Sequence, residues 1–372
     1  MTGYYKVAGF IFAVTLRREC DLEVLLPSFS PFRCDAVEKD GLLFELVEED
    51  VADECPHAEF LEEDVNDLGH TCLYRAGEGY RITLRYDDRE HVIEAGPDFR
   101  RVSAKLRWDD VYVSTVLSSM LRIAFAQAAL LHSAVSLHSS VVLKDGKAFL
   151  FMGKSGTGKS THSRLWIEHL GATLLNDDNP VVRLEGDKAV VYGSPWSGKT
   201  PCYQNESAPI AAMVRLVQAP ENRFGRKSDI EACALLLPGC SVLRFDRNLY
   251  GNLCETLIML AEMVCVGEMR CLPDKDAAAV RIIVPQQKID SSSLSTAAGA
   301  LQQIPISLFD PKRKPVQNRS FSIVREGNIP KADFLPYLGQ KRRLHRFRCT
   351  HKGLHCFAGR FDSDQLPNDA SQ

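Results

Sequence analysis

The sequence lacks several features that would place it in a special class of protein. No run of apolar residues approaches the length of a membrane span, and residues 1–6 contain no signal-peptide core before the strand-like apolar segment 7–16. The 12 cysteines show no repeated spacing, which indicates free thiols in a reducing compartment. These absences predict a cytoplasmic protein without a membrane partner.

The charge of the chain changes sign near residue 281. Residues 281–372 hold 15 Lys+Arg and 7 Asp+Glu, a net of +8, whereas residues 1–280 hold 30 and 41, a net of −11. An acidic body repels phosphate backbones, so we expect small-molecule or protein partners and no nucleic-acid partner for it. A composition of 45% hydrophobic and 25% charged residues is typical of a globular protein.

The chain divides into three predicted regions. Residues 1–105 contain short apolar runs bounded by Gly, Asp and Pro, which predict a small β-rich N-terminal domain with an acidic solvated loop or face at 48–64. Residues 106–280 begin with a predicted helix at 108–131 and form the candidate catalytic domain. Residues 281–372 are basic with little periodicity, which predicts an irregular or disordered tail. A basic arm for nucleic acid is the alternative, and the Cys and His residues at 349–356 fit no zinc spacing.

One stretch fills every fixed position of the phosphate-binding loop pattern, Gly-x-x-x-x-Gly-Lys-Ser. It follows the strand-like run 147–152, which is the second arm of a hairpin predicted over 137–152 with a tight turn at Asp145-Gly146, and it opens the predicted helix 160–170. Small residues let backbone N–H groups face an anion, while the lysine reaches the β- and γ-phosphates and the serine hydroxyl can ligate Mg²⁺. The predicted ATP-binding residues are Gly153, Lys154, Ser155, Gly156, Thr157, Gly158, Lys159, Ser160 and Thr161.

A second apolar strand, 172–176, ends in the carboxylates Asp177 and Asp178. Neighbouring side chains on a strand point to opposite faces, so one carboxylate can serve a metal ion and the other the reacting oxygen. A surface turn is the alternative, because Asn-Asp-Asp-Asn-Pro is also good turn chemistry.

Two further stretches carry candidate polar groups. The Gly/Ser-rich loop 193–201 holds Lys199, which could approach phosphate or substrate, and Glu206 follows it. A plain connecting loop is an equal alternative for 193–201. The basic cluster at 220–227 is interpreted as a solvated surface turn.

In order along the chain, His138, a hairpin, the loop ending in Lys159-Ser160 and the pair Asp177-Asp178 resemble the catalytic domain of HPr kinase/phosphorylase. The resemblance covers about residues 138–272 and is closer to bacterial HPr-kinase-related proteins. It implies an α/β fold with a P-loop core of the kind shared with ATP-dependent phosphoenolpyruvate carboxykinase, preceded by the β-rich domain. It also implies that the protein assembles as a homo-oligomer.

The resemblance further implies a role for each matching residue. Lys159 binds phosphate, and Ser160, Asp178 and Glu206 are the Mg²⁺ ligands. Asp177 takes the proton from an acceptor serine hydroxyl, and His138 tunes the reaction near neutral pH.

Two departures from that family bear on the substrate. Thr161 stands where HPr kinases usually carry Glu, and their Glu-Ile-Arg-Gly stretch after the paired Asp is absent. The sequence therefore predicts an Mg²⁺/ATP-dependent kinase that phosphorylates a hydroxyl, of serine above all, in a protein, peptide or small molecule other than HPr. A nucleotide-gated binding module without efficient transfer is the alternative.

Overall fold

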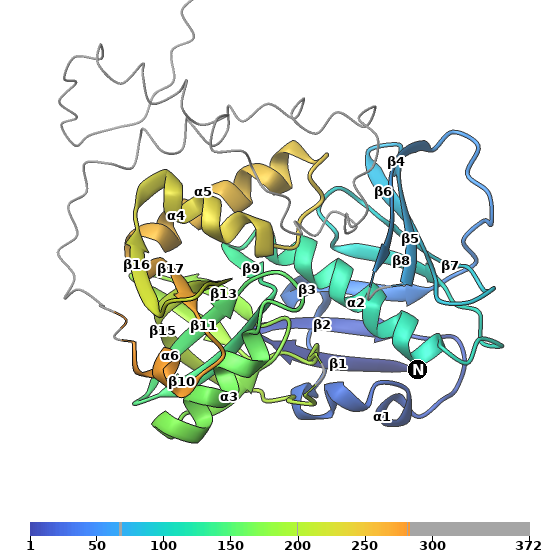
Figure 1. The fold of residues 1–372 in the computed structure, drawn as a ribbon. Coiled ribbons are helices and arrows are strands. Elements are labelled where there is room, and N and C mark those ends of the chain that lie inside the picture. Colours follow the sequence, from blue (N-terminus) through green and yellow to red (C-terminus); the bar gives the residue numbers. More distant parts are fainter. Residues whose placement is uncertain (67–68, 199, 281, 283–372) are drawn as a thin grey trace, which may run out of the picture. The chain divides into compact units, whose positions relative to one another are not determined.

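Two β-sheets organise the chain in the computed structural model, which describes residues 1–66, 69–198, 200–280 and 282 (Figure 1). Both sheets belong to one compact unit. The predicted tail lies outside the described residues, apart from Ile282.

The first sheet has eight strands in the order β1-β2-β3-β8-β7-β6-β5-β4. Several of its strands, β1 and β8 most regularly, alternate buried with more exposed positions, as expected where one face meets a core and the other does not. Its strands are β1 Thr2–Val7, β2 Phe10–Thr15, β3 Leu42–Glu48, β4 Glu59–Asn66, β5 Gly69–Ala76, β6 Gly79–Arg85, β7 His91–Ala95 and β8 Arg101–Lys105.

The acidic segment 48–64, predicted as a solvated loop or face, is a loop at 49–58 and a mostly unburied strand after it, so a solvated face is confirmed there and a loop is not. Residues from Glu59 onward form the edge strand β4, which pairs with β5 in an antiparallel register. Strand formation here follows from cross-strand pairing and not from local apolar pattern, because β4 is rich in acidic residues.

The second sheet has nine strands, along the path β12-β10-β11-β15-β14-β13-β9, with β17 beside β15 and β16 beside β17. β15 is central, and runs parallel to both β11 and β17. The strands are β9 Ala134–Ser136, β10 Ser139–Lys144, β11 Lys147–Met152, β12 Thr173–Asn176, β13 Val181–Glu185, β14 Lys188–Tyr192, β15 Ser207–Gln218, β16 Arg223–Lys227 and β17 Cys265–Cys271.

Local chemistry explains the hairpin that leads to the phosphate-binding loop pattern. Lys144 pairs with Lys147, which leaves Asp145 and Gly146 as a two-residue turn with φ of 52° and 71°. Positive φ at both positions matches the twist of the flanking strands. The hairpin predicted from Asp145-Gly146 is confirmed.

The basic cluster at 220–227 is a strand over much of its length. β16 pairs antiparallel with β17 and places Arg223 opposite Arg270. The prediction of a surface turn is therefore wrong from Arg223 onward. The edge of the sheet supplies the hydrogen-bond partners of this strand, and the local sequence pattern does not predict them.

Helices cover both faces of the second sheet. The bounds are α1 Leu22–Leu25, α2 Val113–Leu130, α3 Lys159–Leu170, α4 Asp229–Leu236, α5 Arg247–Met263 and α6 Lys275–Ala279, with 3-10 turns η1 Pro27–Phe32, η2 Lys39–Gly41 and η3 Leu237–Gly239. Leu150 and Met152 of β11 join the core that includes α2, α4 and α5, whereas Phe151 packs with Trp166 of α3 and with α6. A strand buried on both faces is expected to be apolar throughout, as β11 largely is.

The helix α2 runs through the middle of the described structure (Figure 1). It is long and apolar enough to span a membrane by length and composition, but 78% of it is buried inside the fold, where it contacts both sheets. It begins at Val113 and not at the predicted residue 108. The reason is local: Asp110 accepts a hydrogen bond from Tyr112 N and pairs with the buried His91, so the preceding residues form turns.

The described chain is therefore α/β, with two mixed sheets and one large core shared by both sheets and α2. The first sheet ends at Lys105, while the predicted domain boundary at 105 stays a prediction.

Candidate functional site

The loop between β11 and α3 adopts backbone angles that are accessible mainly to glycine. Gly153, Gly156 and Gly158 have φ of 152°, 81° and 107°, which side-chain-bearing residues rarely adopt. A Cβ on Gly153 would also lie 3.1 Å from the side chain of Thr157. Thr157 N donates to Lys154 O at 3.0 Å and closes the turn. The sequence needs glycine here because of the backbone conformation itself.

Lys159 is the first residue of α3, and only 8% of it is exposed. Its Nζ lies 2.8 Å from His138 Nε2, 2.8 Å from Gly153 O and 3.4 Å from Lys154 O. A charged ammonium group has donors and no acceptor, so all three partners accept from it. These contacts point the ammonium group back into the loop.

His138 connects this lysine to a carboxylate. Its Nδ1 lies 2.8 Å from Asp178 Oδ1, while its backbone N donates to Gly239 O at 2.7 Å and fixes the residue between β9 and β10. Because Nε2 accepts from Lys159, Nδ1 carries the ring proton and donates to Asp178. Lys159, His138 and Asp178 thus form one directed hydrogen-bond chain.

Asp178 has two more partners. Asn179 Nδ2 donates to its Oδ2 at 2.6 Å, and Arg122 Nη1 of α2 lies 3.6 Å from the same oxygen. Burial alone raises the pKa of Asp178, but the hydrogen bond with His138 and the charges of Arg122 and Lys159 outweigh it and hold that pKa below its ordinary value. The carboxylate therefore stays ionised at neutral pH.

Asp177 faces the serine of the loop pattern. Its Oδ2 lies 3.3 Å from the exposed Ser160 Oγ, and its Oδ1 accepts from Ser140 Oγ at 2.9 Å. Ser140 Oγ in turn lies 2.7 Å from Ser163 Oγ. Only 5% of Asp177 is exposed. The oxygen nearest to Ser160 among the described contacts thus belongs to Asp177, and not to its neighbour.

The remaining predicted residues lie at varying distance from this centre. Lys154 and Ser155 are exposed in the loop and Thr161 is half-buried on α3. Glu206 is exposed just before β15; its carbonyl accepts from Gly193 N, and no contact of its carboxylate with Ser160 or Asp178 occurs among the described residues. Lys199 lies outside the described residues.

Sequence reasoning missed several residues that touch this centre, Arg122, Ser140 and Gln218 among them. Arg122 is the one arginine in the apolar helix α2, a signal that could have marked it. Ser140 stands on β10 with no motif around it. Gln218, at the carboxyl end of β15, donates to Gly156 O at 3.3 Å, and only the parallel pairing of β15 with β11 brings it there.

The loop at 193–198 packs against the chain segment 176–178, which carries the paired aspartates. Asn176 Nδ2 donates to Ser194 Oγ at 3.2 Å and to Trp196 O at 3.3 Å. A Cβ on Gly198 would lie 3.1 Å from Asp177 O and 3.3 Å from Asp178 Cβ. There is therefore no room for a side chain at position 198 without movement of one of these segments.

Comparisons with known proteins give only weak likenesses, and these come from solved structures. No protein-family model matches the chain, and no curated protein matches it. Among solved structures it is similar to the HPr(Ser) kinase/phosphatase from Coxiella burnetii, with 14% sequence identity over 25% of this chain and 70% of that chain, at a TM-score of 0.21. A TM-score this low establishes no shared fold.

Proposed function

We propose that this chain is an Mg²⁺/ATP-dependent kinase that transfers the γ-phosphate to a hydroxyl, of serine above all, in a protein, peptide or small molecule other than HPr. One observation carries the proposal: Lys159 and Ser160 open α3 directly after the glycine loop, and Asp177 Oδ2 lies 3.3 Å from Ser160 Oγ. A lysine, a hydroxyl and a carboxylate so placed are the groups that phosphoryl transfer requires.

The loop residues suit the phosphates of a nucleotide. The N-terminus of α3 adds partial positive charge at the loop, and the Lys159 ammonium group is within reach of anything bound over Gly153–Gly158. For that contact, Lys159 must exchange His138 Nε2 and the loop carbonyls for phosphate oxygens. His138 then loses its donor, and its Nε2 becomes available to the bound nucleotide or the acceptor.

The oxygen donors around Ser160 fit a hard cation. The Ser160 hydroxyl and the Asp177 carboxylate would hold Mg²⁺, which prefers one or two carboxylates together with phosphate oxygens and water. Such an ion offsets charge on the phosphoryl oxygens when bound.

The acceptor hydroxyl must give up its proton as its oxygen bonds to the γ-phosphorus and ADP leaves. A carboxylate of the Asp177-Asp178 pair receives that proton. The sequence assigned the proton to Asp177 and the metal to Asp178. The contact between Ser160 and Asp177 supports the opposite division, with the metal at Asp177 and the proton at Asp178.

A nucleotide-gated binding module is the second candidate. It is favoured by the close packing of Gly198 against Asp177 O and Asp178 Cβ. Nucleotide bound beside these carboxylates would shift the 193–198 loop and change the surface offered to a partner, with little phosphotransfer.

The test incubates the full chain with γ-labelled ATP, Mg²⁺ and host lysate separated into macromolecular and small-molecule fractions. The kinase proposal expects label in one fraction with the wild type, and at least about a hundredfold less with Asp177→Ala or Asp178→Ala. Tight ATP binding with no label in any fraction would contradict it and support the binding module.

A further inference from the structure

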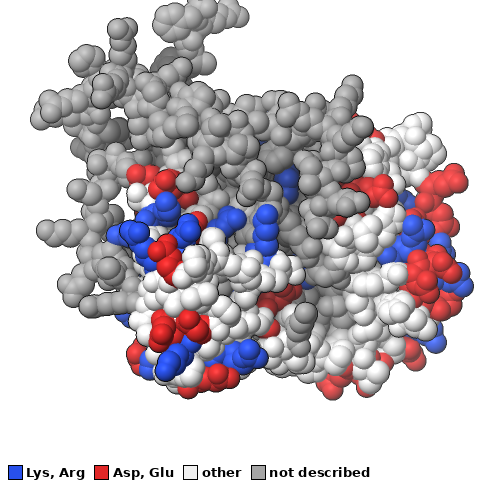
Figure 2. Space-filling model, in the orientation of Figure 1, with Lys and Arg blue, Asp and Glu red and all other residues white. Residues whose placement is uncertain are grey.

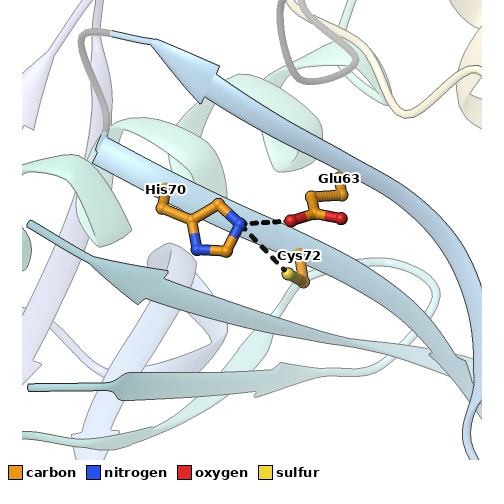
Figure 3. Close-up of side chains that lie close together, drawn as sticks. All are labelled: Glu63, His70 and Cys72. Atoms are coloured by element: carbon orange, nitrogen blue, oxygen red, sulfur yellow. Dashed lines mark hydrogen bonds and ion pairs between the residues drawn. The ribbon is translucent and has the colours of Figure 1, made fainter. Parts of the chain in front are cut away.

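Three side chains with different donor atoms gather on one face of the first sheet, away from the candidate kinase site. Glu63 lies on β4, and His70 and Cys72 lie on β5 (Figure 3). Glu63 stands directly opposite Cys72 in the antiparallel register. His70 and Cys72 are two residues apart, so their side chains leave the same face of the strand. The backbone pairing itself therefore brings the three groups together.

The donor atoms converge on a small volume. His70 Nε2 lies 2.5 Å from Glu63 Oε1 and 4.0 Å from Cys72 Sγ, and the three donor atoms all lie within 4.8 Å of one another. Tetrahedral metal bonds of about 2.0–2.3 Å place such donors roughly 3.3–3.7 Å apart. A bound ion would therefore require rotations of the Glu63 and Cys72 side chains.

We propose that Glu63, His70 and Cys72 bind a divalent transition metal of the Zn²⁺ class. Imidazole nitrogen and thiolate sulfur select borderline and soft ions over Mg²⁺ and Ca²⁺. Three protein ligands leave a fourth position for water or for an exogenous ligand. Glu63 is exposed and the other two are half-buried, so an ion can enter from solvent.

The charges around the site favour a cation. The edge strand β4, which carries Glu63, reads Glu-Phe-Leu-Glu-Glu-Asp-Val-Asn, with four carboxylates and no basic residue. A bound dication pairs with the Glu63 carboxylate and with the Cys72 thiolate, whose proton it displaces.

One neighbour opposes the metal. Arg85 Nη2 lies 2.9 Å from His70 Nδ1, and an arginine can only donate, so Nδ1 accepts and Nε2 carries the proton to Glu63. A metal on Nε2 requires the proton on Nδ1, and Arg85 must then turn away. Arg85 is exposed, which leaves it free to do so. The site thus has a competitor whose removal should tighten binding.

The experiment titrates Co²⁺ into the full-length chain after chelator treatment and follows the near-ultraviolet thiolate-to-cobalt charge-transfer band. Zn²⁺ is then added as a competitor. We expect a band in the wild type, its loss in Cys72→Ser, affinity more than about tenfold weaker in His70→Gln and Glu63→Gln, and tighter binding in Arg85→Gln. Thermal melting of each variant verifies that it folds.

The tail contains other thiols, so a matched control replaces both Cys349 and Cys356 with Ser and should retain the band. A band that survives Cys72→Ser, or no thiolate band in the wild type, overturns the proposal. Loss of the band only in the Cys349→Ser/Cys356→Ser protein would place the metal in the tail and also overturn it.

Discussion

The ammonium group of Lys159 donates a hydrogen bond to His138 Nε2 at 2.8 Å, and the opposite nitrogen of that ring faces Asp178 Oδ1 at 2.8 Å. A lysine held in this way is already partnered before any nucleotide arrives. Nucleotide phosphates must therefore compete with a neutral imidazole and two carbonyls for the hydrogen bonds of the Lys159 ammonium group. Phosphate binds this group more strongly, because hydrogen bonds between two charged groups are stronger than those to neutral acceptors.

Lys159→Ala should abolish productive phosphate binding because it removes the only buried ammonium group at the described loop. We expect turnover at least about a hundredfold lower, a loss of the size that follows removal of one preorganised electrostatic partner. Labelled-ATP kinetics measure it. Lys147→Ala is the matched control, since that side chain is exposed at the start of β11, the end of the strand away from the loop, and should change turnover little. Equal effects of both variants would contradict the assigned role.

Asp177→Asn and Asp178→Asn should impair the kinase in different ways. With Asp177 beside Ser160, its substitution should raise the Mg²⁺ concentration that gives half-maximal rate. Asp178→Asn should instead lower kcat at saturating Mg²⁺, by about 10²–10⁴-fold if it takes the proton. Phosphorylation rates of both variants, measured over a series of Mg²⁺ concentrations, show which aspartate binds the metal and which takes the proton. The reverse pattern would restore the division of roles predicted from sequence.

His162 should make folding stability sensitive to acid. Burial lowers its pKa to about 4, so the folded state keeps it neutral where the unfolded state, with an ordinary pKa of 6.5, takes up a proton. The stability that depends on neutral His162 is fully present above pH 6.5, its pKa in the unfolded state. It declines as the pH falls toward about 4, its pKa in the folded state. The loss attributable to His162 between pH 7 and pH 5 is about 2 kcal/mol.

Urea denaturation at the two pH values measures this loss. His162→Phe preserves the ring packing against Phe151, whose centroid lies 4.5 Å away, but cannot titrate. It should therefore lose less stability than the wild type over the same interval. An identical pH dependence of the two proteins would refute the assignment.

Gly158→Ala and Gly251→Ala should change the stability of the fold in opposite directions. A Cβ on Gly158 or on Gly251 meets no atom within 4 Å, so packing plays no part in either. Gly158 has φ of 107°, and alanine there should cost about 1–2 kcal/mol in backbone strain. Gly251 lies inside the helix α5, where alanine should add about 0.5–1 kcal/mol. Thermal melting compares them, and destabilisation by both would show that the strain argument fails.

Local signals explain what the sequence could predict. Asp145-Gly146 specified a tight turn, and Gly171, with φ of 64°, ends α3 where a helix end was expected. The acidic β4 and the basic β16 gave no such signal, since each is a strand only because β5 or β17 offers a sheet edge. Arg122 and Gln218 reach the site through tertiary packing, which no local spacing encodes.

The surface charge gives one further comparison. In the view of Figure 2, Asp and Glu side chains lie among Lys and Arg side chains over the described surface. On the left of this view Lys and Arg side chains gather, with Asp and Glu side chains between them.

The large core has a consequence for how the protein loses its structure. One apolar cluster contains Phe12 and Phe44 of the first sheet, Phe125 of α2, and Trp196 of the 193–198 loop. A hydrogen bond also joins the two parts, because Tyr80 of the first sheet donates to Asp246, the N-cap of α5, at 2.9 Å. Cutting the chain after Lys105 would expose apolar surface on both fragments. Residues 1–280 should therefore melt in a single cooperative transition, and neither sheet should be a module that recombination could transplant alone.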